Sequence, residues 1–210
     1  MKRFLLVGSV VGCLLFVGTP IASTVPGTAA TVSPSFICDG RYENRTFKHV
    51  RVLPGAKCVL INSTVTGNFM ARNPRTVKVL DTTVGHNLMV RGATHNVIIG
   101  NRGCGVDPVV GNNIKVTKSH NVAICWMTTK NNITVTGNDG RINVSNNDVG
   151  RTLSVSRNKA LVLDPGVTHP EPGAIRVRNN TAGSHIKLFK NHPSRPLRGL
   201  ETNTPTPVVK

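Results

Sequence analysis

Four cysteines outside the N-terminal segment are the residues whose chemistry the spacing predicts most directly. They are Cys38, Cys58, Cys104 and Cys125; the first two are 20 residues apart and the last two are 21 residues apart. An even number of cysteines in an exported chain indicates structural disulfides, and the close Cys-x-x-Cys pair typical of a zinc site is absent. We therefore predict two disulfides, one joining Cys38 to Cys58 and the other joining Cys104 to Cys125.

The carboxylates and histidines form no recognisable catalytic or metal-binding motif. The chain has nine Asp and Glu residues, and Asp81, Asp107 and Asp148 fall at different positions of the repeat described below. A glycosidase needs two carboxyl groups across the scissile bond, and a calcium site needs several oxygen ligands at close range. The seven histidines include no His-Glu-x-x-His pattern. We predict no catalytic residue, no metal site and no cofactor.

An internal repeat of about 19–20 residues must position these side chains. Each copy joins a β-branched residue, a turn with Gly or Asn, and an Asn or Thr that opens a short strand, at positions 68, 87, 113, 132 and 152. The intervals between these positions are 19, 26, 19 and 20 residues, so one copy contains an insertion. Asn68, Asn87, Asn113 and Asn132 are expected to stack as a structural ladder of hydrogen-bonded side chains rather than to bind a ligand.

The pattern within each copy indicates a strand with one buried face. Apolar residues alternate, as in Leu88 and Val90 or in Ile133 and Val135, and no helical stripe is present in the mature chain. Short strands that recur every 19–20 residues predict an all-β, single-stranded, right-handed parallel β-helix of about six to seven coils. Residues one period apart then lie above one another, so each predicted disulfide would connect neighbouring coils.

The N-terminal segment has the features of a secretory signal peptide. Lys2 and Arg3 precede an uncharged apolar run from Phe4 to Val17, and small residues follow. Cleavage is predicted after residue 30, with an earlier site near residue 23 as one alternative and lipidation of Cys13 as another. The rest of the chain is predicted to form three parts: β-helix repeats over 31–164, an irregular loop and terminal coil or cap over 165–196, and a disordered tail over 197–210.

The chain carries a large excess of positive charge. It has 26 Lys and Arg residues and a net charge of +17, and removal of residues 1–30 would leave +15. Outward strand positions hold Arg72, Arg91 and Lys115, and Arg75 and Lys78 flank the coils. A solenoid spaces such side chains at about 4.8 Å, which suits a long polyanion. With only 4% aromatic residues the chain lacks a stacking platform, so nucleic acid is not the expected partner.

Three segments carry a resemblance to a known group of proteins. They are Gly55-Ala56-Lys57-Cys58-Val59-Leu60, Ser63-Thr64-Val65-Thr66-Gly67-Asn68 and Thr82-Thr83-Val84-Gly85-His86-Asn87. The chain resembles small secreted actinobacterial proteins known as right-handed parallel β-helix repeat proteins. Their last coil typically carries Asn-x-Pro after a final strand, which Asn191-His192-Pro193 matches. The resemblance covers roughly residues 36–193, and it implies a fold and secretion but no particular activity.

Taken together, these patterns predict a secreted or cell-wall-associated structural or binding module of the bacterial surface. Its expected partner is an anionic wall or extracellular polymer, such as teichoic acid or an acidic polysaccharide, and no transmembrane segment is expected in the mature chain. Two alternatives stay open at this point. One is a small polysaccharide lyase or hydrolase whose groove is shaped by the 101–112 loop, and the other is an adhesin directed at a host.

Overall fold

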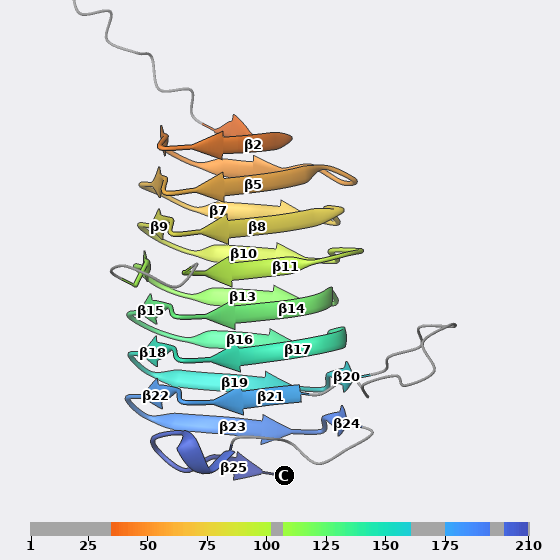
Figure 1. The fold of residues 1–210 in the computed structure, drawn as a ribbon, viewed down its shortest axis with the longest axis vertical. Helices are drawn as coiled ribbons and strands as arrows, with labels where there is room; N and C mark the ends of the chain where they lie inside the picture. Colours follow the sequence, from red (N-terminus) through yellow and green to blue (C-terminus); the bar gives the residue numbers. More distant parts are fainter. Residues whose placement is uncertain (1–34, 102–106, 161–174, 194–199, 210) are drawn as a thin grey trace, which may run out of the picture. The chain divides into compact units, whose positions relative to one another are not determined.

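The computed structural model describes residues 35–101, 107–160, 175–193 and 200–209. In these residues the chain is almost entirely β-strand, with one short 3-10 helix, η1 (Leu200–Thr202). All strand pairs are parallel and form three sheets, A, B and C, of nine, nine and seven strands. As the chain descends in Figure 1, strands of the near sheet run leftward and those of the far sheet run rightward, which is a right-handed winding. The predicted parallel β-helix is confirmed.

Up to β20, each sheet collects every third strand of the chain. Sheet A contains β1 (Phe36–Ile37), β4 (Val50–Val52), β7 (Phe69–Arg72), β10 (Leu88–Arg91), β13 (Ile114–Thr117), β16 (Ile133–Thr136), β19 (Thr152–Ser156), β23 (His185–Phe189) and β25 (Val208–Val209). Sheet B contains β2 (Gly40–Glu43), β5 (Lys57–Ile61), β8 (Thr76–Leu80), β11 (Val97–Gly100), β14 (His120–Cys125), β17 (Asp139–Ser145), β20 (Lys159–Ala160), β21 (Ile175–Arg178) and β24 (His192–Pro193). Sheet C contains β3 (Thr46–Phe47), β6 (Thr64–Val65), β9 (Thr83–Val84), β12 (Val109–Val110), β15 (Thr128–Thr129), β18 (Asp148–Val149) and β22 (Thr181–Ala182).

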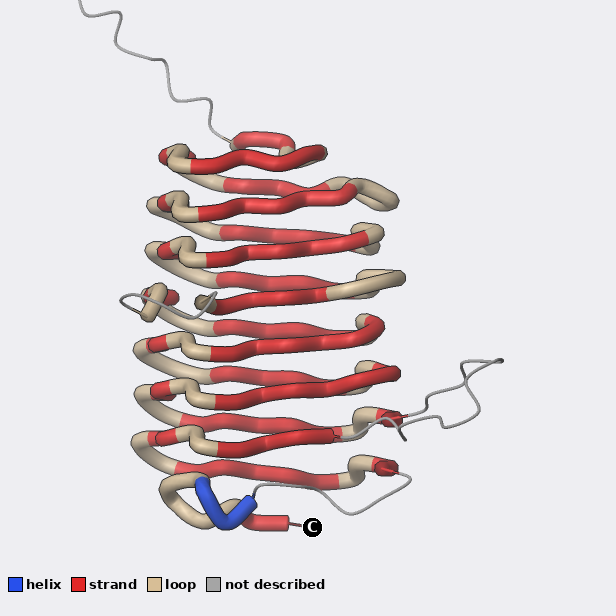
Figure 2. Tube along the Cα trace, in the orientation of Figure 1, coloured by secondary structure: helices blue, strands red, loops and turns tan. Residues whose placement is uncertain are grey.

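One coil takes a strand from sheet B, then sheet C, then sheet A. Seven complete coils follow one another in the described residues, from β2–β3–β4 to β20/β21–β22–β23, and Figure 2 shows them stacked. The period is not constant, because Gly40 lies above Cys58 at an interval of 18 residues, whereas Leu88 lies above Ile114 at 26. The varying period has consequences for the second predicted disulfide.

The core consists of stacked apolar side chains that point inward from all three sheets. Leu88, Ile114, Ile133 and Leu153 occupy one register position in successive coils of sheet A, and each is 0% exposed. Burial of such a side chain contributes about 1.5–3 kcal/mol relative to its exposure to water. The alternation seen in the sequence therefore reports correctly which strand positions face the core.

Single residues with positive φ make the bends on both sides of sheet B. The bend from B to C uses Asn44, Asn62, Asp81, Trp126, Asn146 and Asn179, and the bend from A to B uses Asn73, Gly92, Lys118, Gly137, Arg157 and Lys190. One left-handed residue turns the chain sharply, and Asn and Gly adopt this conformation at least cost. The residue that follows most of them enters the interior, although Arg45, which follows Asn44, is exposed. Several of these followers are therefore buried and polar.

The bend from C to A carries the predicted asparagine ladder. The Nδ2 groups of Asn87, Asn113 and Asn132 each donate to the Oδ1 atom of the asparagine one coil earlier, at 3.1, 3.1 and 3.0 Å. The ladder begins at His49, whose Nδ1 accepts the main-chain N–H of Asn68 at 3.1 Å. These side chains are half-buried, and their hydrogen bonds hold neighbouring coils in register.

Two further ladders were not predicted from the sequence, and both are more deeply placed. One joins Asn138, Asn158 and Asn191 at the bend from A to B, and the other joins Asn147, Asn180 and Asn203 at the bend from B to C. Asn158 is 0% exposed, and its Nδ2 also donates to the carbonyl oxygen of Val135 at 3.1 Å. The interior corners of the solenoid are therefore fastened by amide side chains.

The two predicted disulfides have different outcomes. Cys38 and Cys58 are bonded, with their Cα atoms 5.4 Å apart, and they connect the first coil to the second as predicted. Within the described residues Cys125 is a free cysteine. The bond predicted between Cys104 and Cys125 stays a prediction, because Cys104 falls outside the described residues. The strand register places Gly100 directly above Cys125, at an interval of 25 residues, because this coil contains the insertion.

The C-terminal segments agree with one prediction and correct another. β21, β22 and β23 form a regular coil against β17, β18 and β19, within the range 165–196 where a terminal coil or cap was predicted. The tail predicted to be disordered over 197–210 contains η1 and β25, and β25 pairs with β23. Asn203 extends the buried ladder into this segment, so residues 200–209 cover the last coil. The predicted signal peptide, residues 1–30, falls outside the described residues.

Close approach of two coils makes Gly150 sterically restricted. A Cβ atom at this position would lie 2.8 Å from the carbonyl carbon of Lys130 in the coil before it, and also against the carbonyl oxygen of that residue. Because backbone cannot move aside as a flexible side chain can, we expect Gly150→Ala to lower the free energy of unfolding by about 1–3 kcal/mol. Urea denaturation measures this, with Lys130→Ala at the same bend as a control that should change by less than about 0.5 kcal/mol. Equal midpoints for the two variants would contradict the close approach.

Candidate functional site: the outer face of sheet A

Two rows of side chains run across the outer face of sheet A, one residue of each row per coil. The rows follow from the parallel register, because every second residue of a strand faces outward. The first row consists of Arg51, Met70, Met89, Lys115, Thr134, Ser154 and Lys187. The second row consists of Arg72, Arg91, Thr117, Thr136, Ser156 and Phe189. The first row begins with basic and thioether side chains and the second with arginines, and both continue with hydroxyl side chains before they end at Lys187 and Phe189.

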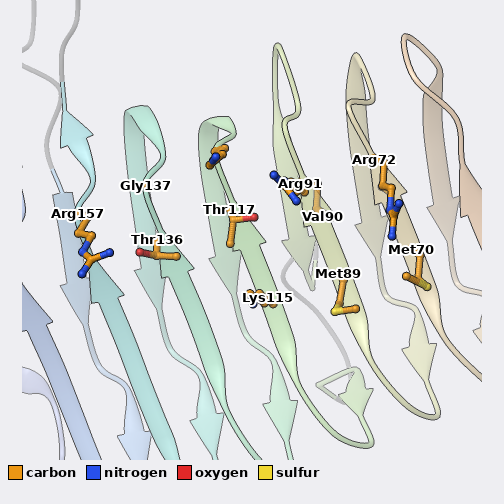
Figure 3. A pocket seen from close by; sticks show the side chains of 12 residues that line it. Met70, Arg72, Met89, Val90, Arg91, Lys115, Thr117, Thr136, Gly137 and Arg157 are labelled. Carbon is orange, nitrogen blue, oxygen red and sulfur yellow. The ribbon is translucent and has the colours of Figure 1, made fainter.

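A groove of about 490 Å³ lies along these rows, and we call it the sheet A groove. Its walls come from five successive coils, β7 to β19, so it runs across the strands and along the solenoid axis (Figure 3). The residues that line it are Met70, Ala71, Arg72, Met89, Val90, Arg91, Lys115, Thr117, Lys118, Thr136, Gly137 and Arg157. A second hollow of about 430 Å³ shares Met70 and Arg72 with it and reaches His49 and Arg51. The two hollows together extend from the first coil to the sixth.

Positively charged side chains line the sheet A groove along most of its length. It contains five cations and none of the carboxylates whose side chains the structure describes. The nearest acidic neighbour along the chain is Asp139, two residues after Gly137, and its Oδ1 lies 2.8 Å from Nδ1 of His120. Because no carboxylate in the groove competes for its cations, an anionic ligand would meet unpaired positive charge.

The five residues predicted to bind a polyanion do not all come together. Arg72, Arg91 and Lys115 line the sheet A groove, as expected from their outward strand positions. Lys78 lies in β8 and lines a different hollow on the outer face of sheet B, together with Arg41 and Lys57. Arg75 is exposed in the turn just before β8. These two residues lie apart from the other three, since a bend separates the two sheets, and polyanion binding by any of the five stays a prediction.

Lys118 and Arg157 also belong to the groove, although neither was predicted as a binding residue from the sequence. Both follow directly after the last residue of a sheet A strand, where the chain bends toward sheet B. Both have positive φ, 50° and 54°, and both line the sheet A groove. The signal available in the sequence was their position one residue after the alternating strand, at which Asn or Gly stands in other coils.

The fold does not bring together the three aspartates singled out in the sequence. Asp81 lies at the bend from sheet B to sheet C, Asp107 precedes β12, and Asp148 is in β18, so they belong to three different coils. Among the described residues no three side chains of His, Cys, Asp or Glu gather closely enough to hold a metal ion. The same part of the chain contains no helix long and apolar enough to cross a membrane.

Comparisons with known proteins add no relative to this description. Protein-family models, curated proteins and solved structures were all searched, and none of them matches the chain.

Proposed function

We propose that this protein is an extracellular binding module that holds a linear anionic polymer in the sheet A groove. The observation that carries the proposal is the row of cations in successive coils with no described carboxylate among them. Arg72 and Arg91 are neighbours in register, so their guanidinium groups belong to coils about 4.8 Å apart. Such regular spacing suits repeated phosphate or carboxylate groups, which arginine binds through its planar fork of donors.

The shape of the groove favours a chain over a compact ligand. Because its walls come from five coils, a ligand that filled it would extend about 19 Å along the axis, crossing the strands. Met70 and Met89 lie beside Arg72 and Arg91 and offer apolar contact area, and Met89 is 36% exposed. A polymer that alternates anionic groups with less polar units, as teichoic acids and acidic polysaccharides do, would use both kinds of side chain.

An extracellular location is consistent with the chemistry of the chain. The Cys38–Cys58 disulfide is of the kind that persists in oxidising compartments, and the N-terminal segment has the composition of a signal peptide. Polymers of the wall or the surrounding matrix are the abundant polyanions in that location. The net positive charge would also accelerate association with them at low ionic strength.

Retention on immobilised heparin and on immobilised wall teichoic acid, measured against salt, tests this proposal. We expect the protein to stay bound at about 0.15 M salt on at least one matrix, with log affinity falling linearly with log salt concentration. The variant Arg72→Gln/Arg91→Gln should bind about tenfold more weakly and lower the salt slope by about 1.5, because two charge contacts are lost. The two matrices distinguish a carboxylate and sulfate polymer from a phosphodiester polymer.

The matched control removes the same charge from the other large sheet. Lys57→Gln/Lys78→Gln takes two cations from the outer face of sheet B, where they line a separate hollow. This variant should retain most of the affinity and the salt slope of the unmodified protein. The proposal fails if the protein elutes from both matrices below about 0.15 M salt. It also fails if the two double variants weaken binding equally, since binding would then depend on the overall charge of the protein and not on the sheet A groove.

A further inference from the structure

Lys118 and Arg157 hold a backbone conformation that their side chains do not favour. Their φ angles are 50° and 54°, in the left-handed region, where long side chains are uncommon. The same bend uses Asn73, Gly92, Gly137 and Lys190 in other coils, and Asn and Gly adopt positive φ more readily than a long side chain does. The bend therefore works without a cation, and the geometry of the chain alone does not explain Lys118 or Arg157.

Neither side chain has a described role in holding the fold together. The main-chain N–H groups of Lys118 and Arg157 pair with the carbonyl oxygens of Thr136 and Phe189, but that bond is available to any residue except proline. Their ammonium and guanidinium groups form no hydrogen bond or ion pair within the part of the chain that the structure describes, and both side chains are exposed. A strained residue without a structural partner is commonly retained for function.

Both cations continue the row begun by Arg72 and Arg91. These two arginines end β7 and β10, and the next two coils offer Thr117 and Thr136 at that row position. Lys118 follows Thr117, and Arg157 follows Ser156. In these two coils the positive charge is therefore located at the bend, whereas in the coils of Arg72 and Arg91 it is located at the end of the strand. Arg157 is labelled on the far side of the groove from Arg72 in Figure 3.

We propose that Lys118 and Arg157 are binding residues for the same anionic polymer, kept in strained positions at the expense of stability. This inference rests on the proposed function and extends it, because it names a path for the polymer: along Arg72 and Arg91 in the second and third coils, then onto the bend at Lys118 and Arg157 in the fourth and sixth. At a protein site that trades stability for binding, a substitution that relieves the strain is expected to raise stability and to weaken binding.

The variant Lys118→Gly/Arg157→Gly separates the two effects, because glycine stands naturally in this bend at Gly92 and Gly137. We expect its melting temperature to equal that of the unmodified protein or to exceed it by up to about 4 °C. Retention on heparin or wall teichoic acid should weaken about tenfold, with the salt slope reduced by about 1.5. The control Lys130→Gly/Arg151→Gly removes two exposed cations from the bend between sheets C and A, outside the groove, and should leave retention nearly unchanged.

Each result of this experiment decides the inference. Weaker retention of Lys118→Gly/Arg157→Gly without a fall in melting temperature supports it, provided that the control variant is retained. If the unmodified protein binds and this variant binds equally well, the inference is overturned while the proposed function stands. A fall in melting temperature also overturns it, because the two cations would then serve the fold. If the unmodified protein binds neither polymer, the proposed function and the inference fail together.

Discussion

We expect Asn158→Ala to lower the free energy of unfolding by about 4 kcal/mol. Oδ1 of Asn158 accepts the main-chain N–H and the Nδ2 group of Asn138, at 2.9 and 3.0 Å. Its own Nδ2 donates to Oδ1 of Asn191 and to the carbonyl oxygen of Val135, at 3.0 and 3.1 Å. Alanine removes all four partners at a site that water does not reach, and each buried group left unpaired costs about 1–3 kcal/mol.

The half-buried ladder supplies the matched comparison for this prediction. Asn132 also lies in a ladder, donating to Asn113 and accepting the main-chain N–H of Thr152, but its side chain is only partly removed from water. Water can replace its lost partners, so Asn132→Ala should cost about 1 kcal/mol. Urea denaturation of the two variants measures the difference. Equal losses would show that burial does not set the strength of these ladders.

The repeated strands of the solenoid could be predicted from the sequence because their signals are local. Alternating residues such as Leu88 and Val90 report which face is buried, and recurring asparagines such as Asn87 and Asn113 mark one bend in each coil. The two buried ladders were missed for a physical reason. Five of their six asparagines follow a bend residue whose identity varies among Asn, Gly, Lys and Arg, and Asn203 follows Thr202, so no fixed motif marks them in the sequence.

Register across an insertion could not be predicted in the same way. The interval between Cys104 and Cys125 is close to the average period, but coils are aligned by strand pairing, and the insertion lengthens this coil to 25 residues between Gly100 and Cys125. The composition of the C-terminal segment predicted disorder there. In the structure, Oδ1 of Asn203 accepts a hydrogen bond from Nδ2 of Asn180 in the preceding coil, and the composition of the segment does not reveal this contact.

The residues of the sheet A groove could also be predicted only in part from the sequence. Arg72, Arg91 and Lys115 were placed correctly because they occupy outward positions of predicted strands. Lys78 satisfied that description equally well, but its strand belongs to sheet B, and assignment of strands to sheets required the three-dimensional structure. Lys118 and Arg157 lie outside any strand, so only the bend geometry shows that they share the groove with the arginines.

Removal of the Cys38–Cys58 bond is expected to loosen the N-terminal coil selectively. The bond closes a loop with a sequence separation of 20 residues, which in the chain-entropy model corresponds to about 3 kcal/mol. A solenoid is stabilised chiefly by contacts between adjacent coils, so a terminal coil can open without the rest. In sheets B and C the first coil has a neighbour on one side only within the described residues, and in sheet A only the two-residue strand β1 precedes it. Phe36, Tyr42 and Phe47 pack together there, with ring centroids 4.4–6.1 Å apart.

The double variant Cys38→Ser/Cys58→Ser should therefore show much faster amide hydrogen exchange in β1 to β4 than the unmodified protein. A loss of 3 kcal/mol corresponds to a rise of about 150-fold in the open population of that coil, whereas exchange in β13 to β19 should change little. Cys125→Ser is the control, since Cys125 is a free cysteine within the described residues, and its exchange should match that of the unmodified protein in β1 to β4. Uniformly faster exchange along all seven coils would contradict local opening, because the first coil would then unfold together with the rest of the solenoid.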